Sequence, residues 1–216
     1  MLSRSLPKRC KIGALLELPS LYAILDTTLA PEPVAAAEAL FAGGIKLMQY
    51  RHKGEFARKH WEQCCRIAEM ARQAGAIFIV NDRLDIALMA GADGVHLGQD
   101  DLPLEAARRV AGAGCIIGMS THYPAQTAAA DALPVDYIAI GPVFATNTKE
   151  NPDPVIGLNG VAAARRETNK PLVAIGGITR ENAASVLGTG ADSVAVARDL
   201  LRGNIEDFVR RVQRNA

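Results

Sequence analysis

From Leu21 onward the chain alternates short apolar runs with longer segments in which apolar residues recur every three or four positions. The short runs are continuously apolar, as expected of strands that are buried on both faces of a sheet. They occupy residues 21–25, 45–50, 76–80, 94–97, 115–119, 137–140, 172–175 and 193–197. The pattern therefore predicts eight strands of the parallel type, with helices between them.

The segments between these runs have the period of amphipathic helices. In residues 56–74, for example, Trp61, Cys64, Cys65 and Ala68 recur at three- and four-residue spacing. Helix starts are expected near Pro33, Pro103, Pro124 and Glu181, and helix ends near Gly43, Gly75, Gly91 and Gly190.

Strand and helix alternate throughout without a second zone of composition, which predicts one α/β domain, a (β/α)8 TIM barrel over residues 21–216. Residues 1–20 form a short N-terminal extension in this interpretation. An open, doubly wound sheet is the alternative, because periodicity alone does not establish that the sheet closes.

Composition adds limits on partners. The 216 residues are 49% hydrophobic and 22% charged, which is ordinary for one globular domain. A net charge of +1 gives no bulk attraction to nucleic acid or to an anionic membrane, so neither is expected as a partner. Any positive charge that serves function must therefore be local. A homo-oligomer is possible in this interpretation.

The N-terminus and the cysteines bear on cellular location. The apolar run at 12–18 is short, contains Glu17 and lacks a small-residue cleavage site behind it, so no signal peptide is expected. No segment is long enough to span a bilayer. The four cysteines, which lack metal-ligand spacing, are Cys10, Cys64, Cys65 and Cys115. We therefore expect a cytoplasmic protein with reduced thiols.

Two acidic residues precede predicted strands in nearly identical contexts, Gly-Ala-Asp-Gly-Val at 91–95 and Gly-Ala-Asp-Ser-Val at 190–194. Both Asp93 and Asp192 stand between a predicted helix and the strand that follows it. This is the face of a barrel at the amino ends of the strands, which contributes stability. We assign both residues to structure rather than to chemistry.

Chemistry in this fold gathers in the loops after the strands. After the second strand, Gln49, Arg51 and Lys53 alternate along the chain and so share a face. A guanidinium beside an ammonium suits a phosphate or diphosphate, although a solvated basic turn is an equal alternative.

Acidic residues follow the third and fourth strands. Asn81 and Asp82 end the third, while Asp100 and Asp101 follow His96 at the end of the fourth. Such carboxylates could jointly hold Mg²⁺, which takes one or two carboxylates plus phosphate oxygens. Either acid could instead cap the following helix, and for one of the adjacent pair a cap is the better interpretation.

The remaining loops carry donors for anions. Ser120 follows the fifth strand, and Thr146, Thr148 and Lys149 lie in a long loop after the sixth. Gly176-Gly177 and Arg198 follow the seventh and eighth strands, where many barrels bind a phosphate. The loops together predict two anion sites and an acidic pair. No Walker or Rossmann fingerprint is present, so neither ATP nor NAD is implied.

Six motifs appear in this order at the expected strand ends: Gln-Tyr-Arg-His-Lys at 49–53, Asn-Asp-Arg at 81–83, His-Leu-Gly-Gln-Asp-Asp at 96–101, Gly-Met-Ser at 118–120, Thr-Asn-Thr-Lys at 146–149 and Gly-Gly-Ile at 176–178. Over about residues 21–212 the chain resembles the thiamine phosphate synthase family. The resemblance implies that a hydroxymethylpyrimidine diphosphate and a hydroxyethylthiazole phosphate are joined, by a dissociative mechanism with Mg²⁺.

The resemblance also implies roles for particular residues. It makes Asp82 and Asp101 the Mg²⁺ ligands, and in this way alone it decides between Asp100 and Asp101. The pyrimidine diphosphate would be bound by Gln49, Arg51, Lys53, Asn81, Ser120 and Lys149, among which Arg51, Lys53, Ser120 and Lys149 would be catalytic. The thiazole phosphate would be bound by Thr146, Thr148, Gly177, Ala197 and Arg198. Arg198 departs from the family, which often has a small hydroxyl residue there.

Three other interpretations compete with this one. A thiazole tautomerase would need neither the acids nor the basic cluster, although His122 is compatible with it. A phosphosugar isomerase or lyase would need a buried acid–base pair. A sensor of phosphorylated ligands would release no pyrophosphate, and clustered carboxylates without a ligand repel each other.

Overall fold

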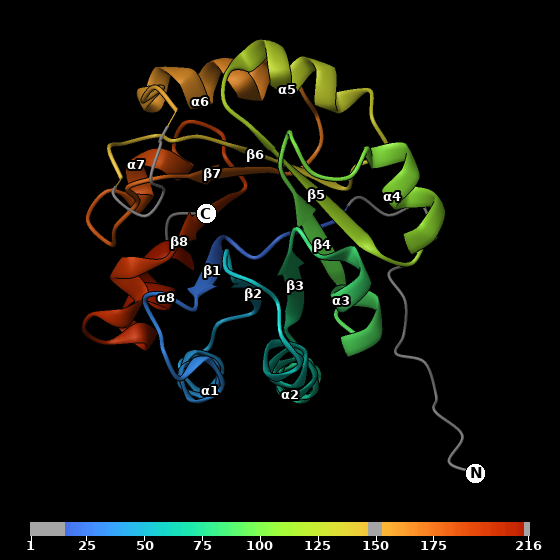
Figure 1. The fold of residues 1–216 in the computed structure, drawn as a ribbon. Helices are drawn as coiled ribbons and strands as arrows, with labels where there is room; N and C mark the ends of the chain where they lie inside the picture. Colours follow the sequence, from blue (N-terminus) through green and yellow to red (C-terminus); the bar gives the residue numbers. More distant parts are fainter. Residues whose placement is uncertain (1–15, 147–152, 214–216) are drawn as a thin grey trace.

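The computed structural model describes residues 16–146 and 153–213. Its strands are all parallel and form one closed barrel in chain order, with the helices around the outside (Figure 1). The strands are β1 (Leu21–Asp26), β2 (Leu47–Arg51), β3 (Ile77–Asn81), β4 (Gly94–Leu97), β5 (Ile116–Thr121), β6 (Tyr137–Ile140), β7 (Leu172–Ile175) and β8 (Ser193–Val196). The predicted barrel is confirmed, and the open sheet is wrong because β8 pairs with β1.

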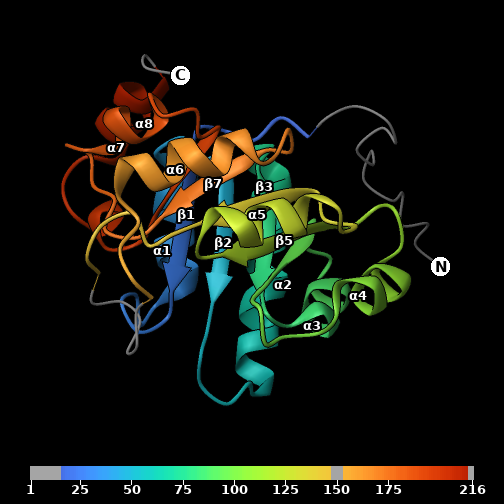
Figure 2. The same cartoon turned by 90° about the horizontal axis from the view of Figure 1, so that it is seen from above.

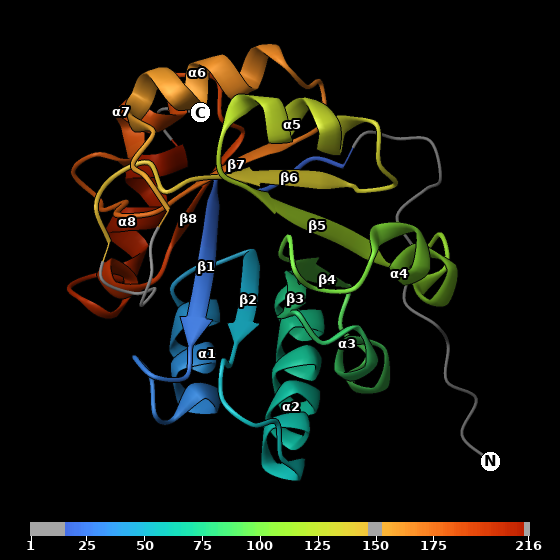
Figure 3. The same cartoon turned by 45° about the horizontal axis from the view of Figure 1, so that its top comes forward.

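The helices follow the strands as the periodicity predicts. They are α1 (Pro33–Ala42), α2 (Arg58–Ala74), α3 (Leu84–Ala90), α4 (Leu104–Ala111), α5 (Pro124–Asp131), α6 (Gly157–Arg166), α7 (Ala183–Leu187) and α8 (Ile205–Gln213). A 3₁₀ turn, η1 (Arg198–Leu201), lies between β8 and α8. In Figure 2 and Figure 3 the arrowheads of β1 and β2 point to the same edge of the barrel, where the following loops begin.

Most of the predicted helix boundaries hold. Pro33 and Pro124 stand in the first turn of their helices, where the missing N–H costs nothing. Gly75 ends α2 in the left-handed conformation, with φ of 60°. The expected end at Gly190 is wrong, because α7 ends at Leu187 and a turn with a Gly190 N–H to Leu187 carbonyl bond follows.

The core has two layers, because side chains alternate between the inside of the barrel and the helices. The inner cluster comprises Tyr22, Ile24, Leu47, Ile79, Ile116, Tyr137, Ala139, Val173 and Ala195. A larger cluster between strands and helices includes Leu25, Phe78 and Phe208, all almost fully buried. Burying each such large side chain contributes about 1.5–3 kcal/mol. The inner layer carries two tyrosine hydroxyls into an otherwise apolar interior.

The acids before the strands are structural, as predicted. Asp93 accepts the Phe78 N–H at 2.8 Å, and Asp192 accepts the Leu172 N–H at 2.7 Å. A third acid repeats the arrangement: Asp136, directly before β6, accepts the Ile117 N–H of β5 at 2.7 Å. Each acid thus joins an even-numbered strand to the strand before it.

Other predictions concern thiols and membranes. Cys64, Cys65 and Cys115 are free thiols, whereas Cys10 lies outside the described residues. Burial raises the pKa of Cys64 to about 12 and that of Cys115 to about 11, which keeps both protonated. Within residues 16–146 and 153–213, no helix has the length and hydrophobicity needed to cross a membrane.

Candidate active site

A cavity of about 750 Å³ opens at the carboxyl ends of the strands. The predicted site residues that line it are Gln49, Arg51, Lys53, Asn81, Asp82, Asp101, Ser120, Thr146, Gly177, Ala197 and Arg198. The predicted Thr148 and Lys149 lie outside the described residues. Every described residue of the predicted set therefore faces one common space.

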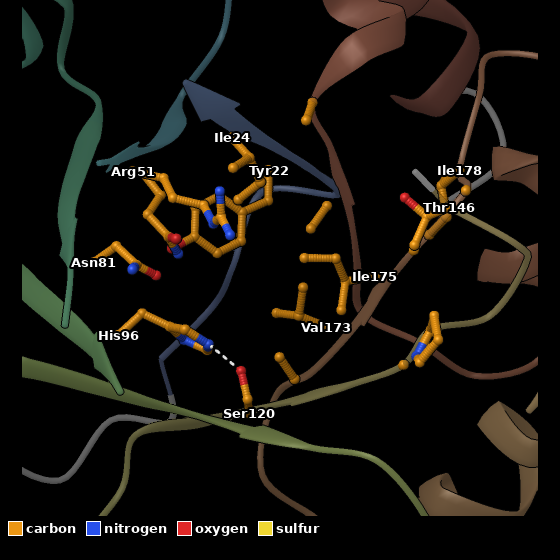
Figure 4. A pocket seen from close by; sticks show the side chains of 18 of the residues that line it. Tyr22, Ile24, Arg51, Asn81, His96, Ser120, Thr146, Val173, Ile175 and Ile178 are labelled. Atoms are coloured by element: carbon orange, nitrogen blue, oxygen red, sulfur yellow. Dashed lines mark hydrogen bonds between the residues drawn. The ribbon is translucent and has the colours of Figure 1, made fainter. Parts of the chain in front are cut away.

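The cavity has a polar side and an apolar side. Figure 4 shows Arg51, Asn81 and His96 on one side, and Ile175 and Ile178 with Thr146 on the other. The side chain of Ile175 is 36% exposed, although it lies in a strand of the barrel. An exposed aliphatic surface in a pocket suits an apolar ring.

Arg51 is fixed by an acid that the sequence did not single out. Asp26 pairs with Arg51 in register at the ends of β1 and β2, and its carboxylate accepts a bond from the Arg51 guanidinium. The other carboxylate oxygen accepts the Thr28 N–H at 2.9 Å and the Thr28 hydroxyl at 2.6 Å. Because Asp26 is only 2% exposed, it forms a rigid support for the guanidinium.

The acidic pair lines the same cavity as Arg51. Asp82 accepts a bond from the Lys53 ammonium at 2.6 Å, and Asp101 accepts the Gly98 N–H at 2.6 Å. Burial raises the pKa of Asp82 above its ordinary value; Lys53 opposes this shift, and the neighbouring Asp101 adds to it. One partly exposed lysine does not neutralise two adjacent carboxylates. The two carboxylates therefore suit a bound cation.

Backbone geometry supports this interpretation of Asp82. It is the one described non-glycine residue with positive φ, at 61°, and the Arg83 N–H bonds across it to the Asn81 carbonyl at 2.7 Å. A left-handed aspartate costs about 1–3 kcal/mol, and such residues cluster at functional sites. The capping alternative is wrong for these acids, because neither α3 nor α4 has a side-chain cap bond.

Asn81 lines the cavity and has an unpaired side-chain nitrogen. Its side chain is 7% exposed, and its Nδ2 atom makes no hydrogen bond to any described residue. Buried amide nitrogens are nearly always paired, so an unpaired one beside the cavity is unusual.

An interior network of hydrogen bonds lies beneath the polar side. Gln49 Nε2 donates to the Tyr22 hydroxyl at 2.9 Å, and the hydroxyls of Tyr22 and Tyr137 are 2.9 Å apart. His96 Nδ1 lies 2.9 Å from the Tyr137 hydroxyl, and its Nε2 lies 2.8 Å from Ser120 Oγ (Figure 4). Burial lowers the pKa of His96 to about 4, so its imidazole is neutral near pH 7.

The loop after β7 packs closely against the loop after β6. Gly176 and Gly177 have φ of 105° and 62°, which favour glycine. A Cβ on Gly177 would lie 2.6 Å from the Ala145 carbonyl oxygen, so no other residue fits without movement. The loop therefore brings its backbone against the loop after β6.

An ion pair joins the loops after β7 and β8. Arg180 Nε donates to Asp199 at 3.0 Å, and its Nη2 donates to the Asp199 carbonyl at 2.9 Å. Asp199 and Arg202 line the cavity beside Ala197 and the exposed Arg198. The sequence did not single out Arg180, Asp199 or Arg202.

Comparisons with known proteins identify the family of this chain. A family model described as thiamine monophosphate synthase matches residues 21–200. The thiamine-phosphate synthase of Koribacter versatilis is 52% identical over 192 residues, which cover 86% of this chain and 90% of that protein.

The chain belongs to this family.

Further relatives extend the match. The thiamine-phosphate synthase of Pelotomaculum thermopropionicum is 41% identical over 208 residues, 95% of this chain and 94% of that protein. The solved thiamine phosphate pyrophosphorylase from Pyrococcus furiosus has a TM-score of 0.82 and 34% identity, and it covers 91% of this chain and 95% of its own. The resemblance in the sequence motifs is thus confirmed at the level of the family.

His122 is the residue of the cavity that is compatible with a tautomerase. Its Nδ1 lies 2.9 Å from the Gly141 carbonyl and 3.4 Å from Asp153. Because a carbonyl oxygen can only accept, Nδ1 is the donor in this bond. The acidic and basic side chains at the ends of β2 to β4 line the same cavity as His122.

Proposed function

We propose that the protein is a thiamine-phosphate synthase. It joins 4-amino-2-methyl-5-hydroxymethylpyrimidine diphosphate to 4-methyl-5-(2-hydroxyethyl)thiazole phosphate and releases pyrophosphate. The observation that carries the proposal is the acidic pair, Asp82 and Asp101, beside Arg51 and Lys53 in a cavity whose opposite wall is the Gly176-Gly177 loop. Family membership supports the same activity.

Mg²⁺ is the proposed cofactor, and the residues present fit it. Asp82 and Asp101 would hold the ion, since both are carboxylates and the pKa of Asp82 is raised partly by its neighbour. Among the described residues no group of three or more potential ligands occurs, so phosphate and water oxygens would complete the coordination. When bound, the ion would offset negative charge on a leaving diphosphate.

The protein's own cations bind the same group. Arg51, held by Asp26, offers a fixed guanidinium to the diphosphate, and Lys53 offers an ammonium on a flexible stem. Asn81 donates its unpaired Nδ2 to a further acceptor. These donors stabilise the charge that develops as the bond from the pyrimidine methylene carbon to the diphosphate oxygen breaks.

The second half of the reaction needs an orienting surface for the thiazole. Ile175 and Ile178 would contact its ring, and the backbone near Gly177 and Ala197 would bind its phosphate. Pyrophosphate leaves first, with the bonding pair of the broken C–O bond. The thiazole nitrogen then gives its electron pair to the methylene carbon of the pyrimidine cation. Thr148 and Lys149, which the family resemblance also assigns, remain part of this proposal.

Other functions fit these residues less well. A tautomerase would use His122 and leave Asp82, Asp101 and Lys53 without purpose. A phosphosugar isomerase would need a buried acid–base pair, whereas the buried His96 is neutral and joined to hydroxyls. A sensor would bind both ligands without releasing pyrophosphate. Cytoplasmic location and a homo-oligomer stay predictions.

Synthesis is tested by incubating the purified protein with both substrates and Mg²⁺ and following thiamine phosphate by mass spectrometry. We expect product that disappears with EDTA and in Asp82→Asn. A folded protein that binds the thiazole phosphate but makes no product would refute the proposal. Isomerisation of the thiazole phosphate alone would favour the tautomerase, and binding without turnover the sensor.

A further inference from the structure

The interior network comprises Gln49, Tyr22, Tyr137, His96 and Ser120, which come from strands β2, β1, β6, β4 and β5. Its links measure 2.9, 2.9, 2.9 and 2.8 Å in that order. All of its members except Ser120 are less than a tenth exposed, and Ser120 reaches the cavity. The network therefore runs from one wall of the cavity to another through the interior of the barrel.

The fold makes room for this network at Gly118. In register, Gly118 lies between His96 of β4 and Tyr137 of β6. A Cβ there would lie 2.0 Å from Cζ of Tyr137 and 2.4 Å from its hydroxyl oxygen. Only glycine lets the Tyr137 ring cross β5 and meet His96, with which it stacks at 5.5 Å between centroids. The contact between Tyr137 and His96 therefore depends on a glycine at this position of β5.

Counting hydrogens gives the network a direction. Gln49 Nε2 can only donate, so the hydroxyl of Tyr22 accepts from it and passes its own hydrogen to Tyr137. Tyr137 in turn donates to His96 Nδ1. The neutral imidazole then carries its hydrogen on Nε2 and donates to Ser120 Oγ.

The opposite direction leaves a buried hydrogen unpaired. If Ser120 donated to His96, Tyr137 would donate to Tyr22, whose hydroxyl would then accept two bonds. The Tyr22 hydrogen would have no acceptor among the described residues, although its side chain is 1% exposed. An unpaired buried donor of this kind is costly.

We propose that Tyr137 and His96 are positioning residues that commit the Ser120 hydroxyl to donate its hydrogen into the cavity. The Ser120 hydrogen is then available to a substrate oxygen or nitrogen with a lone pair. The network also couples the Gln49 side of the cavity to the Ser120 side, because reversal of one link reverses them all. The effect on catalysis rests on the proposed function, while the direction of the network does not.

The direction is tested on the free protein by ¹⁵N NMR of labelled histidines, with His96 assigned by its loss in His96→Gln. We expect the Nε2–H tautomer, with Nδ1 in the shift range of a hydrogen-bond acceptor. In Tyr137→Phe the hydrogen-bonded Nδ1 signal is lost. In Tyr22→Phe, which removes a hydroxyl from the same buried network, the signal is kept. An Nδ1–H tautomer in the wild-type protein would overturn the proposal.

The positioning role is tested by kinetics of thiamine phosphate formation. Loss of one directed hydrogen bond lowers kcat/KM by about 10-fold in Tyr137→Phe, and Tyr22→Phe causes a smaller loss. Ser120→Ala combined with Tyr137→Phe should be no worse than Ser120→Ala alone, since both changes remove the same donation.

Two outcomes would contradict the positioning role. In the first, the losses of kcat/KM in the two single variants multiply in the double variant. In the second, Tyr22→Phe and Tyr137→Phe lower kcat/KM equally. Thermal denaturation of each variant establishes that it is folded. A wild-type protein that makes no thiamine phosphate would refute the proposed function, whereas the tautomer measurement would still decide the direction of the network.

Discussion

The two ends of the barrel use aspartate in opposite ways. At the amino ends of the strands, Asp93, Asp136 and Asp192 each accept the backbone N–H of a neighbouring strand. Two of these acids also meet an arginine, Arg108 at 2.5 Å and Arg165 at 2.8 Å. Every one of these carboxylates thus has its partners within the fold.

At the carboxyl ends the acids are gathered together. Asp82 and Asp101 adjoin each other, and Lys53 is the cation paired with Asp82. Like charges at short range oppose folding, whereas a ligand cation would relieve the repulsion. The same residue type therefore contributes stability at one end of the barrel and a binding site, at some cost in stability, at the other.

The largest expected effect is at the carboxyl end. Asp82→Asn keeps a residue that tolerates positive φ but removes one charge of the pair. We expect kcat/KM to fall by about 10²–10³-fold, the usual consequence of losing one electrostatic contact to developing charge. Thermal stability should be unchanged or higher because the repulsion with Asp101 is gone.

The measurement is thiamine phosphate formation at several Mg²⁺ concentrations, together with a thermal melt. A large fall in stability with little loss of activity would show that Asp82 serves the fold, as the acids at the other end do.

His96 provides a pH-dependent contrast within the carboxyl end. Its pKa is lowered by burial from 6.5 to about 4, so between these values the unfolded state binds the additional proton. Stability from the neutral imidazole is present above pH 6.5 and is lost as pH falls toward 4. The full shift corresponds to roughly 3 kcal/mol.

Urea denaturation should show this as a fall in unfolding free energy from about pH 7 to about pH 4.5 that is smaller in His96→Gln. Identical pH dependence in the two proteins would mean that His96 is already charged or exposed in the folded state.

The amino end should respond in stability alone. Asp192→Ala leaves the N–H of Leu172, a fully buried residue, without its acceptor and removes the carboxylate partner of Arg165. We expect a loss of about 1–3 kcal/mol of unfolding free energy. Because Asp192 is remote from the cavity, kcat/KM at a permissive temperature should stay within about twofold. Urea titration and the synthase assay measure the two quantities, and a selective loss of activity would break the contrast between the ends.

The sequence predicts the barrel well because buried parallel strands leave long apolar runs. It also predicts some of the charged residues that line the cavity, since charge directly after such a run is conspicuous: Arg51, Lys53, Asp82, Asp101 and Arg198. Tyr22 and Tyr137 are not predictable in this way, because a tyrosine inside an apolar run has the pattern of a core residue. Only the register of the closed barrel brings their hydroxyl groups together. Asp26 directly ends the first apolar run, and its contact with Arg51 depends on the register between β1 and β2.

Contacts between distant segments were the least predictable. Asp136 repeats the role of Asp93 and Asp192, yet Pro-Val precedes it instead of Gly-Ala, so the repeat is hidden in the sequence. The ion pair of Arg180 with Asp199 depends on how two loops meet in space. Pairing of this kind follows from the closed barrel rather than from any local pattern.

The smallest effect is expected at Arg198, the residue that departs from the family pattern. Its side chain is exposed at the edge of the cavity, where water screens its charge. The proposed phosphate contacts at this loop come from backbone groups, and Arg180 holds that loop through Asp199. Arg198→Ala should therefore raise KM for the thiazole phosphate by no more than about threefold, with kcat unchanged. Arg180→Ala is the sharper comparison, because it releases the loop and should raise the same KM more. A tenfold rise in Arg198→Ala, reduced by added salt, would instead identify the arginine as a direct phosphate ligand.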